Sequence, residues 1–213
     1  MVISSKKYPH SSPRKAVTEA ANIILDVAEQ LAQTRGYNGF SYADIAAELG
    51  VTKASLHYHF PSKAELGRTL IARYQAAFAD ALEMIDKRTA EPAKKLREYV
   101  GLYDAVMLNH RMCLCGMLAA EYTTLPAPMQ EGLREFFDLN ERWLTTVLQA
   151  GRRSQSLLFK QSANERARVI LGALQGAMLV ARSYGDSRRF QAAAQHILAD
   201  CGAPELSRTS GKP

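Results

Sequence analysis

One stretch of the chain, residues 40–66 with the sequence FSYADIAAELGVTKASLHYHFPSKAEL, restricts the possible folds most strongly. Ser41, followed three residues later by Asp44, predicts the capped start of a helix whose apolar stripe ends at Gly50. Thr52 predicts the cap of a second helix, KASLHYH. Two short helices joined by a glycine-containing turn are typical of a unit that places its second helix in the DNA major groove. We therefore predict a helix-turn-helix.

The second helix has two predicted faces. Its apolar side chains are expected to point inward: Val51, Leu56 and Phe60. Its hydrogen-bonding side chains are expected to point outward: Lys53, Ser55, His57 and Tyr58. His57 and His59 are two residues apart and diverge by about 200° around a helix, so we expect no shared metal ion.

Composition indicates a soluble globular protein and a basic one. The chain has 213 residues, 47% of them hydrophobic and 23% charged, which allows a sizeable core. No apolar run approaches the about 18 residues of a membrane span, and the N-terminus lacks a signal-peptide core, so we expect a cytoplasmic protein without a membrane partner. A net charge of +6 suits a polyanionic partner. Three cysteines without an export signal indicate reduced thiols.

The N-terminal arm is basic and rich in serine and proline. Residues 1–15 contain four basic side chains and no acidic one: Lys6, Lys7, Arg14 and Lys15. Such a segment is not expected to fold alone. It is either a solvated tail or an arm that contacts phosphates or the minor groove, and both interpretations stay open.

The rest of the chain has helical periodicity and no strand alternation. We predict an all-α fold with about nine helices. The helices outside the helix-turn-helix are expected at about 13–35, 62–87, 91–110, 113–122, 128–153, 162–184 and 187–201. The expected domains are a disordered basic arm at 1–12, the DNA-binding domain at 13–61, a C-terminal domain at 62–206 that begins with a connecting helix at 62–88, and a disordered tail at 207–213.

The order of these signals resembles the DNA-binding domain of TetR-type (TetR/AcrR) transcriptional regulators. The resemblance covers roughly residues 15–70 and lies in GlyTyrXaaXaaPheSer, IleAla…LeuGlyValThrLys, LeuXaaXaaHisPhe and ProSerLysXaaXaaLeu. It implies an all-helical homodimer whose C-terminal domain dimerises and binds a small-molecule effector, with no cofactor. The implied function is a ligand-responsive regulator, a repressor that an inducer releases from a palindromic double-stranded DNA operator.

Carried over residue by residue, the resemblance implies a set of DNA contacts. Lys63 matches a phosphate-contacting lysine of the family. His57 departs from the family pattern, which usually has a tyrosine there, and Tyr58 follows one position later. The full set of expected DNA-binding residues is Ser41, Thr52, Lys53, Ala54, Ser55, His57, Tyr58 and Lys63.

Apolar and polar side chains of the C-terminal half are candidates for an effector pocket. They are Tyr99, Tyr103, Met107, Cys113, Met117, Glu121, Phe137, Asn140, Trp143, Gln175 and Met178. Gly172 and Gly176, one helical turn apart, would let another helix approach closely, either in a dimer or within the chain. The candidate dimer interface is Leu171, Gly172, Gln175, Gly176, Leu179, Phe190 and Ile197.

The sequence gives weaker evidence for other functions. The Cys113–Leu114 pair is similar to one that begins a helix in electrophile- and oxidant-sensing members of the family, although two small side chains packed in a core give the same pattern. His110, Cys113 and Cys115 lack the spacing of a zinc site. An enzyme with a cysteine nucleophile would need a partner base that no motif supplies. A DNA-coating protein without an effector would have a C-terminal core without a cavity.

Overall fold

The computed structural model describes residues 13–203, with side chains from residue 19 onward. Within that range the chain forms nine α-helices, one 3-10 turn and no strand, which confirms the all-α prediction. The predicted basic arm at 1–12 and the predicted tail at 207–213 lie outside the described residues. The elements are α1 (Pro13–Arg35), α2 (Tyr42–Leu49), α3 (Lys53–His59), α4 (Lys63–Arg88), α5 (Pro92–Leu108), α6 (Leu114–Ala119), η1 (Tyr122–Thr124), α7 (Ala127–Arg153), α8 (Ala163–Ser183) and α9 (Ser187–Ala199).

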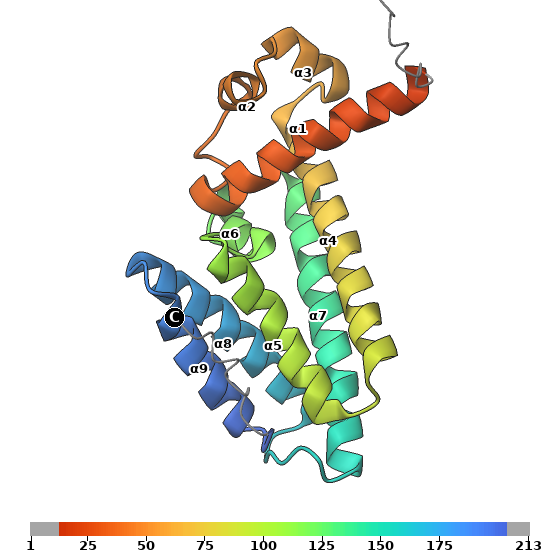
Figure 1. The fold of residues 1–213 in the computed structure, drawn as a ribbon, viewed down its shortest axis with the longest axis vertical. Helices are drawn as coiled ribbons and strands as arrows, with labels where there is room; N and C mark the ends of the chain where they lie inside the picture. Colours follow the sequence, from red (N-terminus) through yellow and green to blue (C-terminus); the bar gives the residue numbers. More distant parts are fainter. Residues whose placement is uncertain (1–12, 204–213) are drawn as a thin grey trace, which may run out of the picture.

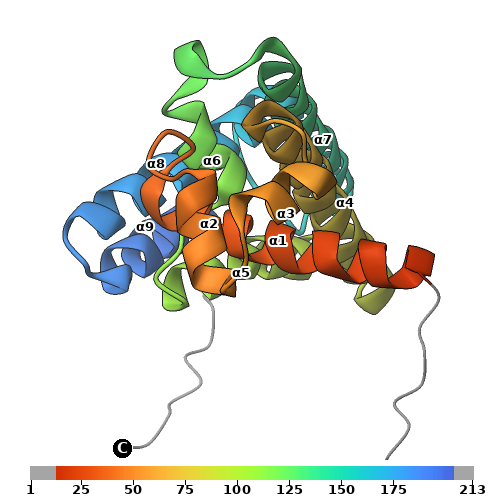
Figure 2. The same cartoon turned by 90° about the horizontal axis from the view of Figure 1, so that it is seen from above.

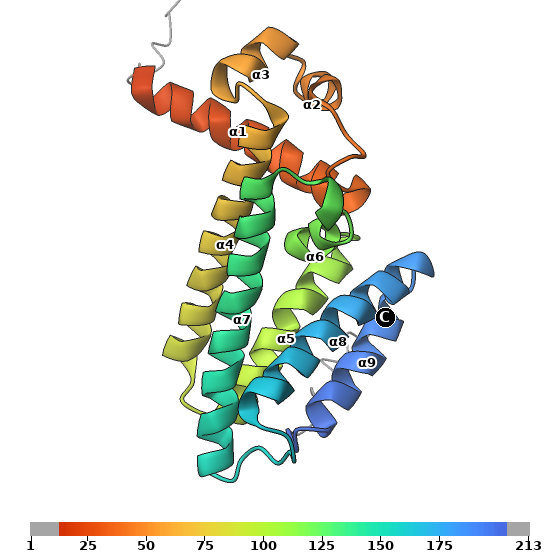
Figure 3. The same cartoon turned by 180° about the vertical axis from the view of Figure 1, so that it is seen from behind.

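The helices form a small group at one end of a longer bundle (Figure 1). Helices α1, α2 and α3 make up this end group, and α1 lies across the top of the bundle (Figure 2). Helix α4 leaves the end group and runs alongside α7, while α8 packs against both α7 and α9 (Figure 3). Any movement of α4 therefore reaches the end group directly.

Local capping fixes where most helices begin. Ser41 and Asp44 form the predicted capping box of α2, and Ser162 and Glu165 form that of α8. At α4 only half of the predicted box is present, because Ser62 accepts from the amide of Glu65 while the Glu65 carboxylate binds Arg68 at 2.5 Å.

None of the described helices is long and apolar enough to cross a bilayer.

Candidate DNA-binding surface and effector domain

The helix-turn-helix is built as the sequence predicts, with one difference. Gly50 ends α2 in the left-handed conformation, at φ 65°, where a residue with a Cβ would be strained. The hydroxyl of Thr52 accepts a hydrogen bond from the amide of Ser55 and so caps α3. Leu56 is 1% exposed, but Val51, expected to face inward, is 42% exposed. Val51 belongs to the turn before α3, where it does not share the inward face of the helix.

The outer face of α3 carries most of the expected DNA contacts. The side chain of Tyr58 is 75% exposed. The other exposed members of the predicted set are Ser41, Thr52, Lys53, Ala54, Ser55 and His57. A seven-residue helix with its apolar side chain buried and its polar side chains exposed has the form that major-groove recognition requires.

His57 already has one partner in the protein. Its Nδ1 lies 3.2 Å from the carbonyl oxygen of Pro61, and its ring centroid lies 4.7 Å from that of Tyr42. A neutral ring that donates from Nδ1 has an acceptor at Nε2. Only the imidazolium form can therefore also donate to a DNA phosphate while this bond is kept.

Lys63 is placed differently from the other predicted contacts. Its ammonium donates to the carbonyl oxygens of Tyr37 and Phe40, and it lies 4.4 Å and 4.3 Å from the centroids of their rings. Burial lowers the pKa of Lys63, while the carboxylates of Glu121 and Asp44 oppose that shift. Two of the three ammonium donors thus bind the turn between α1 and α2, and one is left for another acceptor. Its proposed contact with phosphate stays a prediction.

Glu121, expected in an effector pocket, instead joins the C-terminal half to the end group. Its carboxylate accepts hydrogen bonds from the amide of Tyr37 at 2.6 Å and from the amide of Asn38 at 3.3 Å. Gly36 makes room for it, since a Cβ at Gly36 would lie 2.8 Å from the Glu121 Oε1. We call this contact the Glu121 junction. It ties the segment between α6 and η1 to the turn between α1 and α2.

A second set of contacts fixes α1 to α4. The guanidinium of Arg73 pairs with Asp26 at 2.7 Å and with Glu29 at 2.8 Å. The side chain of Arg73 is partly buried, which strengthens the pairs relative to fully exposed ones. Helix α1 is consequently held both by α4 and by the Glu121 junction.

Three buried polar residues connect α5 to α7. The hydroxyls of Tyr99 and Tyr103 lie 3.0 Å apart, and the Tyr99 hydroxyl donates to Asn140 Oδ1 at 2.8 Å. The amide of Asn140 donates in turn to the carbonyl oxygen of Phe136 at 2.8 Å. Burial raises the pKa of both tyrosines, so both keep their hydroxyl protons. Trp143 stacks on Tyr99, with ring centroids 5.4 Å apart. We call Tyr99, Tyr103 and Asn140 the buried triad.

The other candidate pocket residues divide between two places. Met107, Cys113 and Met178 are buried in the same core as the triad, and Phe137 packs against that core. Met117 and Gln175 lie where α6 meets α8: Met117 contacts Arg182, and Gln175 lies close to Gly116. The sequence thus identified residues that lie inside the C-terminal half. It did not distinguish residues of the hydrophobic core from residues at the contact between α6 and α8.

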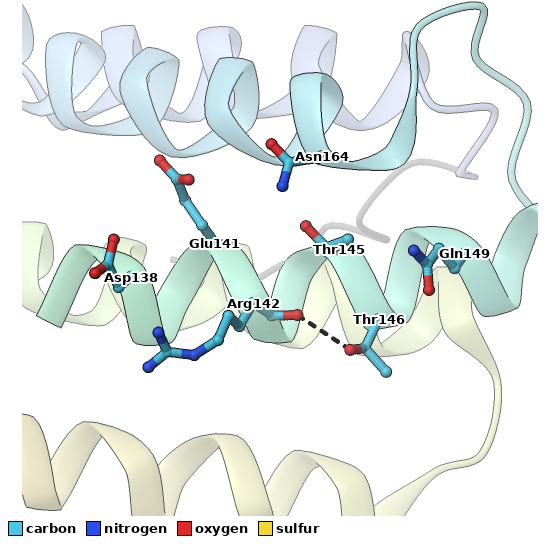
Figure 4. A pocket seen from close by; sticks show the side chains of 7 residues that line it. All are labelled: Asp138, Glu141, Arg142, Thr145, Thr146, Gln149 and Asn164. Atoms are coloured by element: carbon cyan, nitrogen blue, oxygen red, sulfur yellow. Dashed lines mark hydrogen bonds between the residues drawn. The ribbon is translucent and has the colours of Figure 1, made fainter. Parts of the chain in front are cut away.

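Several recesses open at the surface of the C-terminal half. One, of about 580 Å³, lies along α7 and α8 and is lined by polar side chains, with Glu141 directed toward α8 and Arg142 away from it (Figure 4). Another, of about 230 Å³, lies between α1, α4 and α5 and is lined mostly by apolar side chains, among them Tyr74, Phe78 and Val106. Neither is lined by the buried triad. Recess volume alone does not separate an effector-binding protein from a DNA-coating one.

Comparison with known proteins identifies the family of the chain. Residues 24–68 match the family described as bacterial regulatory proteins, tetR family, and residues 92–197 match the tetracyclin repressor-like C-terminal domain. A solved transcriptional regulator of the TetR family from Agrobacterium tumefaciens is 33% identical, with a TM-score of 0.84, over 87% of this chain and 98% of that one. The chain belongs to the TetR family of bacterial regulatory proteins.

Further relatives agree with this assignment. A TetR transcriptional regulator from Legionella pneumophila is 30% identical with a TM-score of 0.76, over 91% of this chain and all of that one. The HTH-type transcriptional repressor NemR of Escherichia coli K12 is 23% identical over 82% of this chain and 89% of its own length. The family consists of DNA-binding regulators, so this TetR-family chain is a DNA-binding transcriptional regulator.

The expected dimer residues of this TetR-family chain fall into two groups. Leu171 and Phe190 are 4% and 0% exposed within the single chain, so they have almost no surface to offer a partner, and their place in an interface stays a prediction. Gly172, Gly176 and Leu179 are exposed on α8, while Gln175 and Ile197 are partly buried. Helical periodicity had identified the apolar positions of α8 and α9 but not which face the rest of the chain covers.

All three cysteines of the chain are free and buried. Cys113 is 1% exposed. Burial raises the pKa of the Cys115 and Cys201 thiols, and Cys201 also accepts a hydrogen bond from Arg166 at 3.2 Å. An electrophile would reach Cys113 only after local opening. Cysteine sensing therefore stays a prediction.

Proposed function

We propose that this chain is a ligand-responsive repressor that binds a palindromic operator as a dimer, with α3 of each subunit in the major groove. The observation that carries this proposal is the outer face of α3, where Lys53, Ser55 and Tyr58 are exposed while Leu56 fixes the helix to its own domain. Two such helices on a two-fold axis would enter successive major grooves about 34 Å apart. The names of relatives such as NemR favour repression over activation.

The DNA-binding part of the proposal is tested with Lys53→Ala. The operator is first obtained by selecting bound fragments of genomic DNA with the purified protein. We expect the substitution to weaken operator binding about tenfold, because it removes the proposed contact of Lys53 with DNA. Stability should stay unchanged, because the Lys53 side chain is exposed. Fluorescence anisotropy over a salt series measures both affinity and salt slope.

The matched control is Lys94→Ala, which removes an exposed lysine from α5, far along the chain from α3. Its operator affinity should equal that of the parent. If no fragment is enriched, or if Lys53→Ala binds as tightly as Lys94→Ala, then α3 is not the recognition helix.

We further propose that the effector acts on the end group through α4 and the Glu121 junction. The apolar recess between α1, α4 and α5 is called here the effector groove. It is lined by Tyr74, which packs against the core that contains the buried triad. A molecule that enters there would separate α4 from α5. Because α4 carries Arg73 and Lys63, its displacement would move α1 and α3 relative to the bundle and change the spacing of the two recognition helices.

The dimer is proposed to form through the exposed face of α8. That face carries small and apolar residues at helical spacing: Val169, Gly172, Ala173, Gly176 and Val180. A row of small residues allows close approach of a second helix, and an exposed apolar stripe of this kind commonly marks an interface. The facing surface of α9, next to α8, would complete a four-helix contact in the dimer.

Gly176→Arg tests this interface. A Cβ at Gly176 would have no heavy atom within 4 Å in the single chain, so the subunit should fold as before. In the dimer the arginine would occupy the space of the partner helix. We expect a monomer by analytical ultracentrifugation at micromolar concentration, and operator affinity reduced at least a hundredfold because one half-site then binds alone.

Gly101→Arg in α5 is the control, because Gly101 also has open space around its Cβ position and lies outside the proposed face. It should remain a dimer. A dimeric Gly176→Arg variant would show that α8 does not form the interface.

A further inference from the structure

A recess of about 200 Å³ lies where α5, α8 and α9 come together, apart from the groove and the buried triad. Its lining includes Met107 at the end of α5, His110 and Arg111 in the following turn, and Arg182 near the end of α8. Ser187, the first residue of α9, closes another side. Three side chains with basic groups thus border a space large enough for a small molecule.

The positive charge of these side chains is not neutralised within the described part of the chain. Arg182 directs one guanidinium nitrogen to the thioether sulfur of Met117, at 2.8 Å, and another to the carbonyl oxygen of Thr34. Arg111 has a long contact of 3.5 Å with the side-chain amide of Gln30. Neither arginine is within ion-pair distance of a carboxylate of residues 19–203, unlike Arg73 or Arg166. Because the acceptors that bind Arg111 and Arg182 are neutral, the positive charges of both guanidinium groups remain available to an anionic ligand.

The one acidic residue in the lining does not cancel this charge. Asp186 caps α9 by accepting from the amide of Arg188, and its carboxylate binds the Arg188 guanidinium at 2.8 Å and 3.1 Å. Asp186 is thus already paired. The N-terminus of α9, a helix of 13 residues, adds partial positive charge at the same side of the recess.

We propose that this recess binds the anionic group, a carboxylate or a phosphate, of a small molecule through Arg111 and Arg182. A planar guanidinium can bind either anion with two parallel hydrogen bonds, and two of them from different elements would hold it from two directions. The site lies on the side of α8 that faces α6, since Arg182 contacts Met117, and so differs from the proposed dimer face.

The same recess is connected to the end group. Arg182 donates to the carbonyl oxygen of Thr34, near the end of α1, so an anion that recruits this guanidinium competes with α1 for it. Binding of the anion and the position of α1 are then linked, and each affects the other by the same free energy. This consequence for DNA rests on the proposed function, whereas anion binding itself does not.

Anion binding is tested on the full chain without DNA. Inorganic phosphate and acetate are titrated separately at constant ionic strength, and thermal unfolding is followed. We expect a saturable rise in Tm with at least one of them, and Arg111→Gln should weaken the apparent affinity about tenfold. Ser187→Glu, which places a carboxylate at the start of α9 where helices favour it, should abolish the rise.

Arg153→Gln, at the end of α7, serves as the matched loss of one exposed arginine and should respond like the parent. A response to phosphate alone or to acetate alone would support the site and identify the group it prefers. No saturable response to either anion, or responses of Arg111→Gln and Ser187→Glu equal to the parent, would overturn the proposal. Operator affinity with and without the anion is measured separately, so that a failure to affect DNA leaves the binding result intact.

Discussion

Lys63→Ala is expected to lower the free energy of unfolding by about 3 kcal/mol, far more than an ordinary surface lysine would. The substitution removes a charged donor from the carbonyl oxygens of Tyr37 and Phe40 and leaves both without this partner. It also removes the cation from between their two aromatic rings. Urea unfolding followed by circular dichroism measures the change. Lys53→Ala, which also removes a lysine from the first position of a helix, should change stability by less than about 0.5 kcal/mol.

The same variant separates two roles of Lys63. If the third ammonium donor contacts a DNA phosphate, the salt slope of operator binding should also fall by about one unit. If the salt slope is unchanged while stability is reduced, the role of Lys63 is only structural: it joins α4 to the end group. Stability equal to that of Lys53→Ala would contradict the structural role.

Asn140→Ala is expected to lower the free energy of unfolding by about 3 kcal/mol, because it removes a polar side chain that is 0% exposed. The substitution leaves the Tyr99 hydroxyl without its acceptor and the carbonyl oxygen of Phe136 without its side-chain donor. It also leaves a small cavity between α5 and α7. Thermal and urea unfolding measure the loss. Asn109→Ala, which removes an exposed amide that binds its own helix, provides the comparison.

A double-mutant cycle identifies the cause. If the loss comes from an unpaired hydroxyl, Tyr99→Phe combined with Asn140→Ala should be more stable than the sum of the two single changes predicts, by about 1 kcal/mol. Additive effects would point to the cavity instead. Since the buried triad joins α5 to α7, the single change is also expected to loosen the side of the bundle next to the proposed effector groove.

The helices were predictable because local signals determine them. Ser41 with Asp44, Thr52, and Ser162 with Glu165 begin their helices as the sequence indicates, since a side chain and an amide three residues apart suffice. The outward face of α3 followed from the same periodicity. Val51 failed because it stands in a turn, where helical spacing does not apply.

The contacts between distant parts of the chain were not predictable in this way. Glu121 binds amides 84 and 83 residues earlier, and no local pattern distinguishes it from an acid that lines a pocket. Lys63 matched a family position, but its carbonyl partners depend on the packing of α4 against a turn. Leu171 and Phe190 are apolar in the same way as exposed interface residues, and the packing of α8 and α9 decides that they are buried.

The Glu121 junction has a consequence for how regulators of this kind can be recombined. Its acceptor is a side chain of the C-terminal half, but its donors are main-chain amides of residues 37 and 38, which any residue except proline supplies. The Glu121 junction therefore requires only one particular residue of the helix-turn-helix domain, a glycine at position 36. At that position φ is +82° and the Glu121 carboxylate lies close. A helix-turn-helix with a different specificity could be grafted onto this C-terminal half without rebuilding the Glu121 junction, provided that its first helix also supplies the two acids that pair with Arg73.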